Sequence, residues 1–291
     1  MSKVVVRLVG GLGNQMFQYA AARAVALSNQ VPLSLDTSWF INADDRRYAL
    51  APFHIDAVLV PSTLHSKPSG RWVKLLSRLG VRLGMGNSGL PRYVEKRFTF
   101  DPAVAALQAP IYLDGYFQSE KYFERVRRQI ASEFTLRSEP SPQTRDMLLW
   151  INEVDSICVH IRRGDYVSNS ATHAYHGICS LDYYRAGLEI VCQGLDRPHC
   201  FVFSDDPEWV RENFQANLPF TSVDIHGAQE AHEDLRLMAA CRRFVIANSS
   251  LSWWGAWLGS RNGKIVVAPK RWFQSGNNDT RDLIPAGWLR V

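Results

Sequence analysis

Residues 157–166 read ICVHIRRGDY, an apolar run that ends in two arginines and a Gly-Asp pair. The apolar part is typical of the end of a buried strand, and Gly-Asp is typical of a turn. In open α/β sheets, ligands bind beyond the carboxyl ends of the strands, and an arginine there offers a charged planar fork that matches phosphate. These residues alone leave two interpretations open. Either Arg162 and Arg163 bind a phosphate-bearing ligand, or Arg163 forms an ordinary loop salt bridge with Asp165.

The remainder of the second half of the chain alternates strand patterns with helix patterns. Strands are predicted over 156–161, 200–204, 222–225, 244–247 and 265–268. Helices are predicted between them, over 181–192, 207–213, 230–241 and 251–258. Such alternation predicts a parallel, doubly wound sheet.

The first half begins with a similar unit. A strand over 4–9 runs into the turn GGLGNQ, which is followed by a helical period and a second strand over 33–36. Further on, a strand from residue 111 leads to a predicted helix over 120–134. We therefore expect an α/β protein with two Rossmann-like domains, residues 1–150 and 151–291, that face a central ligand cleft. The Pro- and Ser-rich residues 138–142 place the boundary near 138–155.

The glycine turn invites comparison with the dinucleotide-binding fingerprint. Gly11-x-Gly13 is present and Asp36 lies near the end of the second strand, but the third glycine position holds Met16. Because close helix–strand packing needs glycine there, Met16 argues against NAD binding. The turn can instead let a ligand approach Asn14 and Gln15 at a helix N-terminus, or it can be simple turn chemistry.

The composition is that of a folded globular protein with a mildly basic balance. The 291 residues are 46% hydrophobic and carry a formal net charge of +5, which suits an anionic ligand or membrane surface without requiring either. The five cysteines are odd in number and contain no C-x-x-C, which favours reduced thiols over a disulfide framework. No signal peptide or membrane-spanning run is recognisable. We expect a cytoplasmic protein, soluble or peripheral on the inner face of the membrane.

A local excess of positive charge lies between residues 62 and 100, where Glu95 is the one acid among eight Lys/Arg. Within it, residues 71–83 place leucines at helical spacing beside a stripe of Arg71, Lys74, Arg78 and Arg82. Such a helix can lie on an anionic membrane. The alternative is a solvated cationic face whose leucines pack on the domain.

Two more polar groups are expected at the carboxyl edge of the second sheet. Residues 203–206 (FSDD) end a strand in two acids, and residues 247–257 (ANSSLSWWGAW) lead from a strand into a helix. Ser249 and Ser250 can be plain caps, but their hydroxyls and the free N–H groups of the helix also make an anion site. With the arginines on the same edge, a pyrophosphate site is the favoured interpretation. Asp205 and Asp206 can accept from a base or ribose, or cap the helix before Pro207.

Five segments stand out in order over nearly the whole chain: GGLGNQMFQYAA (10–21), DGYFQSEKYF (114–123), VHIRRGDY (159–166), ANSSLSWWGAWL (247–258) and VAPKRWF (267–273). Together they resemble the bacterial α-1,2-fucosyltransferase family, which is related to the α-1,6- and protein O-fucosyltransferases. The resemblance implies a GT-B-like pair of Rossmann domains and GDP-fucose as donor. It also implies inverting transfer to the 2-hydroxyl of a terminal galactose on a surface glycan, which can be lipid-linked. A different linkage, or a non-catalytic nucleotide-sugar or glycan-binding protein, is the alternative.

The resemblance also implies roles for individual residues around the donor. Arg162 matches the family's phosphate-binding arginine, and Asp234 matches an acid near the nucleotide, where it would recognise guanine or ribose. No convincing metal-binding Asp-x-Asp is present, so the arginines and the helix start would neutralise the leaving pyrophosphate without a metal or other cofactor. The residues assigned to GDP-fucose are His160, Arg162, Arg163, Ser204, Asp205, Asp234, Asn248, Ser249 and Ser250.

The general base and the acceptor contacts are less sharply defined. Asn14 matches the asparagine of some relatives, and it can orient a hydroxyl or phosphate but is no normal base. Asp36, Asp114 and Asp165 are the candidate bases, unless the departing phosphate takes the proton. The acceptor residues expected are Gln15, Tyr116, His176 and Trp253. Trp253, Trp254 and Trp257 have near-helical spacing, which favours core packing for at least two of them.

A zinc site is weighed and disfavoured. His173-x-x-His176-x-x-Cys179 has metal-ligand spacing, but no fourth ligand is nearby and Gly177 makes the segment a poor rigid site. The expected partners are therefore GDP-fucose and a galactose-containing glycan, with membrane contact through 71–83 as an option and no nucleic acid.

Overall fold

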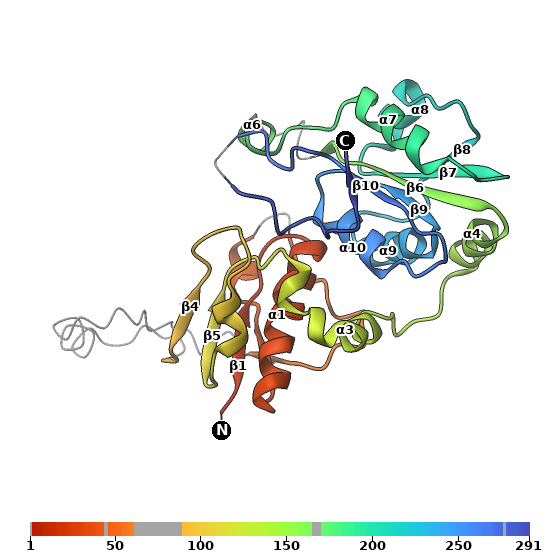
Figure 1. The fold of residues 1–291 in the computed structure, drawn as a ribbon. Coiled ribbons are helices and arrows are strands. Elements are labelled where there is room, and N and C mark those ends of the chain that lie inside the picture. The colour runs from red at the N-terminus through yellow and green to blue at the C-terminus, as the bar shows by residue number, and fades with distance from the viewer. Residues whose placement is uncertain (1, 44–45, 61–88, 165–169, 276–277) are drawn as a thin grey trace. The chain divides into compact units, whose positions relative to one another are not determined.

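The structure is a computed structural model that describes residues 2–43, 46–60, 89–164, 170–275 and 278–291. The predicted basic helix over 71–83 and the candidate base Asp165 lie outside the described residues. The chain forms two compact units, one of Met1–Thr135 with Arg281–Leu283, the other of Leu136–Thr280 with Ile284–Val291. Each has its own parallel sheet, which confirms the expected pair of Rossmann-like parts (Figure 1).

The first unit holds a five-stranded parallel sheet in the order β3-β2-β1-β5-β4. The strands are β1 (Val4–Arg7), β2 (Leu33–Asp36), β3 (Val58–Val60), β4 (Arg92–Val94) and β5 (Ile111–Asp114). Helix α1 (Leu12–Asn29) starts directly after the glycine turn and is buried along most of its length. It ends at Gln30, whose left-handed conformation (φ 55°) lets its N–H bond to carbonyls of the last turn.

The predicted helix over 120–134 is broken into three pieces. They are the 3₁₀ turns η5 (Glu120–Tyr122) and η6 (Glu124–Val126) and the short helix α3 (Arg127–Glu133). The breaks coincide with Phe123 and Val126, whose backbones leave the helical region. Phe123 is fully buried, so its packing outweighs the local helical preference. Two further 3₁₀ segments, η1 (Ser38–Asn42) and η4 (Pro102–Ala106), complete the described elements of this unit.

A buried ionic network joins α1 to α3. The Tyr19 hydroxyl donates to Glu133 Oε2 at 2.6 Å, and Arg23 donates to Glu133 Oε1 through Nε at 3.0 Å and Nη2 at 2.8 Å. Arg23 also pairs with Asp56 at 2.7 Å. Burial and the Glu133 hydrogen bond raise the pKa of Tyr19, so the phenol stays a donor. The network replaces the water that these polar groups lose on folding.

The second unit holds a six-stranded parallel sheet in the order β11-β10-β9-β6-β7-β8. Its strands are β6 (Asp155–Ile161), β7 (Pro198–Ser204), β8 (Phe220–Val223), β9 (Arg243–Val245), β10 (Val266–Ala268) and β11 (Leu289–Arg290). Its helices are α4 (Pro142–Glu153), α6 (Ser170–His176), α7 (Leu181–Val191), α8 (Pro207–Asn213), α9 (Ala231–Ala240) and α10 (Ser250–Leu258). The chain divides before α4, since this helix packs on α9 of the same unit.

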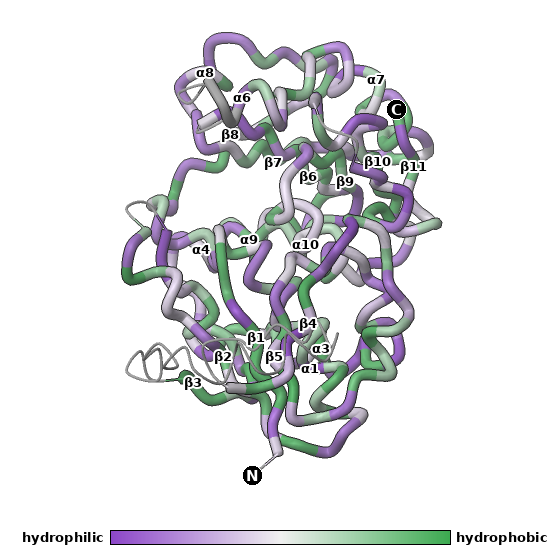
Figure 2. Tube along the Cα trace, turned by 90° about the vertical axis from the view of Figure 1, so that its left-hand side faces the viewer, coloured by the Kyte–Doolittle hydropathy of each residue, from purple (hydrophilic) through white to green (hydrophobic). Residues whose placement is uncertain are grey.

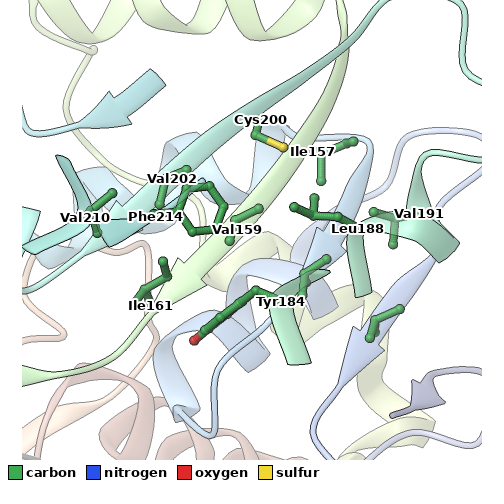
Figure 3. Close-up of a cluster of buried hydrophobic side chains, with 12 residues drawn as sticks. Ile157, Val159, Ile161, Tyr184, Leu188, Val191, Cys200, Val202, Val210 and Phe214 are labelled. Carbon is green, nitrogen blue, oxygen red and sulfur yellow. The ribbon is translucent and has the colours of Figure 1, made fainter. Parts of the chain in front are cut away.

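Alternation along β6 sorts its side chains between two layers. Ile157, Val159 and Ile161 face a core that includes Tyr184 and Leu188 of α7 (Figure 3). Cys158 and His160 therefore face the other side of the sheet, which α4, α9 and α10 cover (Figure 1). Figure 2 shows hydrophobic residues, in green, gathered along the central strands of each unit. Among the described helices, none is both long and apolar enough to cross a membrane.

Candidate functional site

The two arginines after β6 have different environments. Arg163 donates from Nε to Asp206 at 3.1 Å, and its guanidinium lies 3.9 Å from the centre of the Trp209 ring on α8. Arg162 pairs through Nη1 with Asp205 at 2.9 Å, and it continues the side of β6 on which His160 lies. Arg163 is thus held against α8. Arg162 instead lies on the side of the second sheet that α9 and α10 cover.

Asp205 links the ends of β6 and β7. Its Oδ2 accepts from Arg162 and its Oδ1 accepts from the Arg163 backbone N–H at 2.8 Å. A Cβ on Gly164 would lie 2.4 Å from Asp205 Oδ2, so this approach needs glycine. The register explains the meeting, because Ile161 pairs with Ser204 and both strands end at one edge. Both arginines thus pair with acids that directly follow β7, while the alternative pair of Arg163 with Asp165 lies outside the described residues.

Asp206 and Ser204 serve the local turn. Asp206 caps α8 by accepting from the Trp209 N–H at 3.2 Å, and Ser204 Oγ accepts from the Asp206 N–H at 3.0 Å. Helix capping, the plain alternative for this acid, is therefore what the structure contains.

His160 is a neutral group beneath this edge. Its side chain is buried, and burial, assisted by the positive charge of Arg162 and opposed by Asp205, lowers its pKa to about 4. Its Nδ1 atom has no hydrogen-bond partner among the residues that the structure describes. The adjoining backbone is fixed, since the Tyr184 hydroxyl donates to the His160 carbonyl at 3.0 Å.

The start of α10 offers backbone donors on the same edge. Ser249 is the N-cap residue, yet in this described helix its side chain makes no capping hydrogen bond. Ser252 Oγ donates back to the Ser249 carbonyl at 3.2 Å. The first N–H groups of α10 therefore do not donate to the hydroxyl of Ser249. An anion site at a helix start requires N–H groups that are not already capped in this way.

Asn248 is held within the protein. Its side chain is 3% exposed, and Nδ2 donates to the carbonyls of His176 at 2.9 Å and Trp272 at 3.2 Å. Its Oδ1 accepts from Cys179 Sγ at 3.7 Å. The amide therefore joins two loops in this structure, and its contact with GDP-fucose stays a prediction.

The loop that Asn248 holds carries His176. The His176 ring packs against Tyr175 and Phe273, with ring centres 4.8 and 5.5 Å away. Within the described residues, no three His, Cys, Asp or Glu side chains are grouped to hold a metal ion, and this covers His173, His176 and Cys179. Acceptor contact by His176 stays a prediction.

Trp253 packs in the core. Its side chain is completely buried, and its ring centre lies 5.0 Å from that of Trp254 and 5.4 Å from that of Trp288. It stacks on Trp257 at 6.2 Å. The core alternative holds for all three tryptophans of α10, and the structure gives no support to acceptor contact by Trp253.

Asp234 lies in the first turn of α9, half-buried. His226 Nδ1 lies 2.8 Å from Asp234 Oδ1, while His226 Nε2 lies 2.8 Å from the Thr144 hydroxyl. Burial raises the pKa of Asp234, and the His226 hydrogen bond opposes that rise. Sequence reasoning missed His226 and Thr144, since nothing in their local patterns links them to residue 234.

In the first unit, the glycine turn positions Asn14. Gly10 has φ +76°, and a Cβ there would lie 2.7 Å from Asn14 Nδ2. Gln118 Nε2 donates to Asn14 Oδ1 at 2.7 Å, which fixes the amide with its donor Nδ2 beside Gly10. Gln118 was overlooked although it belongs to the family-like segment 114–123. Asn14 as an orienting donor stays a prediction.

Gln15 is also held within the protein. Its side chain is fully buried, with Nε2 donating to the Gly10 and Arg47 carbonyls at 2.9 and 2.8 Å. Its Oε1 accepts from the Ala49 N–H at 2.8 Å. Because both polar atoms of the amide are used within the protein, the structure gives no support to the predicted acceptor contact.

The candidate bases of the first unit are both engaged. Asp36 is 4% exposed and accepts from the Tyr112 hydroxyl at 2.6 Å and the Ser38 N–H at 2.9 Å. Asp114 pairs with Arg7 at 3.5 Å and with Arg92. The Asp36 carboxylate is thus used within the protein and almost buried, which gives no support to its assignment as a base. Asp114 is an arginine partner rather than an open carboxylate.

Tyr116 is the one predicted acceptor residue with a largely exposed side chain among those described, at 44%. Glu95 holds its backbone by accepting from the Tyr116 N–H at 2.7 Å and the Phe117 N–H at 3.1 Å. Burial raises the pKa of Glu95, and these backbone bonds oppose the rise. In the sequence, Glu95 stands out only as an isolated acid, so its role in holding the backbone at Tyr116 was not predicted.

The whole chain, residues 1–291, matches the model of glycosyl transferase family 11. The chain belongs to that family. An α-1,2-colitosyltransferase of Escherichia coli is 30% identical over 100% of this chain and 99% of its own. The galactoside α-(1,2)-fucosyltransferase 2 of Sus scrofa is 26% identical over 87% of this chain and 68% of its own. This family 11 member is thus a fucosyltransferase-like glycosyltransferase, as the five segments indicated.

The fold is found in solved glycosyltransferase structures. POFUT1 in complex with GDP-fucose superposes with a TM-score of 0.53 at 12% identity, covering 92% of this chain and 98% of that chain. At this identity the likeness concerns the fold alone, and it confirms the expected GT-B-like class for this family 11 member.

Proposed function

We propose that this family 11 glycosyltransferase transfers L-fucose from GDP-fucose to the 2-hydroxyl of a terminal galactose, inverting the anomeric carbon. The observation that carries the proposal is Arg162, placed at the carboxyl end of β6 on the side of the sheet where α10 begins. The relatedness to a galactoside α-(1,2)-fucosyltransferase supports both donor and linkage.

Donor binding requires an exchange at Arg162. Arg162 and Arg163 face Asp205 and Asp206, so these four side chains carry no net charge. The pyrophosphate replaces Asp205 at the Arg162 guanidinium, and the displaced carboxylate, already 24% exposed, turns to water or to a ribose hydroxyl. Arg163 stays on Trp209 and keeps the loop in place.

The bond between the anomeric carbon and the GDP oxygen then breaks while the acceptor oxygen forms the new bond. Negative charge grows on the leaving pyrophosphate, where Arg162 and the first N–H groups of α10 stabilise it. With Asp36 and Asp114 engaged, the acceptor proton passes to Asp165 or to a phosphate oxygen of the leaving group.

A colitosyl donor is the second candidate, since the E. coli relative is named for that transfer. The two are separated by kcat/KM for fucosyl and colitosyl donors measured with one galactoside acceptor. A clear preference for GDP-fucose supports the proposal. A preference for the colitosyl donor would replace fucosyl transfer with colitosyl transfer as the function. Transfer from neither donor points to the non-catalytic alternative.

Turnover is expected to survive removal of divalent metal ions. Because Arg162 and the α10 N-terminus supply the positive charge at the leaving group, enzyme dialysed against EDTA should keep its kcat within about 2-fold. The measurement is GDP release with and without added Mg²⁺ or Mn²⁺. Loss of activity that either metal restores would contradict this electrostatic assignment.

A further inference from the structure

A chain of hydrogen bonds runs from the start of α4 to the first turn of α9. Ser141 Oγ lies 2.9 Å from Thr144 Oγ1, which lies 2.8 Å from His226 Nε2. His226 Nδ1 in turn lies 2.8 Å from Asp234 Oδ1. These links join a helix, a loop and a second helix that are far apart in sequence.

One assignment of protons satisfies every member. An ionised Asp234 can only accept, so His226 Nδ1 donates to it, and Nε2, in the tautomer that carries its proton on Nδ1, accepts from the Thr144 hydroxyl. Thr144 Oγ1 then accepts from the Ser141 hydroxyl, while Ser141 Oγ accepts from the Thr144 N–H at 3.1 Å. The direction of donation is therefore from α4 toward the carboxylate.

Burial decreases along this chain. Thr144 is completely buried, the His226 side chain is 5% exposed and the Asp234 side chain is 30% exposed. Asp234 Oδ2 has no hydrogen-bond partner within the described residues and is not buried. One oxygen is thus fixed from behind while the other is open to a ligand.

The open oxygen lies at the donor edge of the second sheet. Helix α9 follows β8 and precedes β9, so its first turn lies beyond the carboxyl ends of the strands, as do Arg162 and the start of α10. A second tie holds the same parts together, because Arg236 Nη2 donates to the Ser138 carbonyl at 2.7 Å. The position of Asp234 is therefore set from two sides.

We propose that Thr144 and His226 are positioning residues that hold the Asp234 carboxylate for a guanine base, and so set the nucleobase preference of the enzyme. This rests on the proposed guanine-nucleotide donor. The Watson–Crick edge of guanine presents an N1–H and an amino group as donors, and a carboxylate only accepts. Adenine has an acceptor at N1, so it leaves the positioned carboxylate unpaired, which is costly.

The test uses the full chain and measures the affinities of GDP and ADP by calorimetry. Thr144→Val removes one hydroxyl at nearly constant shape, and Thr144→Ser keeps it. Thr144→Val is expected to lower the GDP/ADP affinity ratio by about 10-fold, with ADP affinity unchanged, because one positioned hydrogen bond is lost. Thr144→Ser should restore the ratio. In turnover, the donor KM should rise at unchanged kcat.

The chain contains a matched control. His199 Nε2 and the Thr221 hydroxyl are 2.9 Å apart, a second Thr–His pair near the opposite ends of β7 and β8. Thr221→Val removes an equivalent bond and should leave the GDP/ADP ratio unchanged. If Thr144→Val fails to fold, His226→Asn is measured in its place. The asparagine amide can still donate to Asp234, but it no longer reaches Thr144.

The outcomes separate this inference from the proposed function. If wild type prefers GDP but a folded Thr144→Val or His226→Asn protein keeps the wild-type ratio, the positioning role is overturned and the guanine donor stands. A similar fall in Thr221→Val also overturns it, because the effect is then general. If wild type shows no preference for GDP over ADP, the positioning role and the proposed donor both fail.

Discussion

Arg162→Ala is expected to lower kcat for fucosyl transfer by about 10²–10³-fold, the usual cost of removing one preorganised donor at developing charge. The guanidinium lies at the carboxyl end of β6, where the leaving pyrophosphate gains its negative charge. Asp205, its partner at 2.9 Å, would be left as an unpaired acid at the same position and would repel the phosphates further. The measurement is GDP release at saturating donor and acceptor.

Arg185→Ala provides the matched control. Arg185 also pairs with an aspartate, Asp182 at 2.7 Å, but both side chains are largely exposed, at 58% and 86%. An exposed pair of this kind contributes little to stability, and turnover should stay at the wild-type level. Near-normal turnover of a folded Arg162→Ala protein would remove Arg162 from the mechanism. A glycan-binding protein without catalysis would instead keep acceptor affinity in that variant.

Glu133→Ala is expected to destabilise the first unit by about 3–5 kcal/mol, because it leaves the buried Arg23 charge with only the exposed Asp56 among its described ion-pair partners. Arg23 and Glu133 side chains are 9% and 5% exposed, and Tyr19 and Gln129 also donate to this carboxylate. The change removes all of these acceptor contacts at once. Urea unfolding followed by a probe in the first unit measures the loss.

The control for Glu133 lies in the same unit. Arg127→Ala breaks the pair with Glu120 at 2.9 Å, where the arginine is 45% exposed. Its expected cost is below about 1 kcal/mol, since solvent screens such pairs. Equal losses of unfolding free energy in the two variants would contradict the view that burial makes the Glu133 network strongly stabilising.

The strand and helix order was predictable because buried parallel strands leave continuous apolar runs in the sequence. Residues 156–161 show this plainly, and their carboxyl end was correctly expected to carry Arg162 beside other polar groups. The individual partners were not predictable. Asp205 reaches Arg162 only through the register of β6 with β7, and a one-residue slip would bring different side chains together.

The site assignments that the structure does not support share a physical cause. Asn248 and Gln15 occupy family-like motifs at helix starts, where a side-chain amide can either face a ligand or bond to the backbone of another loop. The carbonyls that they serve, such as those of Trp272 and Arg47, are distant in sequence and come into reach only on folding. Asp36, at the end of β2, is engaged for the same kind of reason. Its partner Tyr112 lies on β5, which β1 separates from β2, and a local sequence pattern does not encode this strand order.

The central claim is tested most directly by the product formed from GDP-fucose and a terminal β-galactoside. Its linkage and anomeric configuration can be read by NMR after purification. The account predicts fucose on the galactose 2-oxygen, with the anomeric configuration opposite to that of the donor. Fucose on another hydroxyl, or retained configuration, would contradict it.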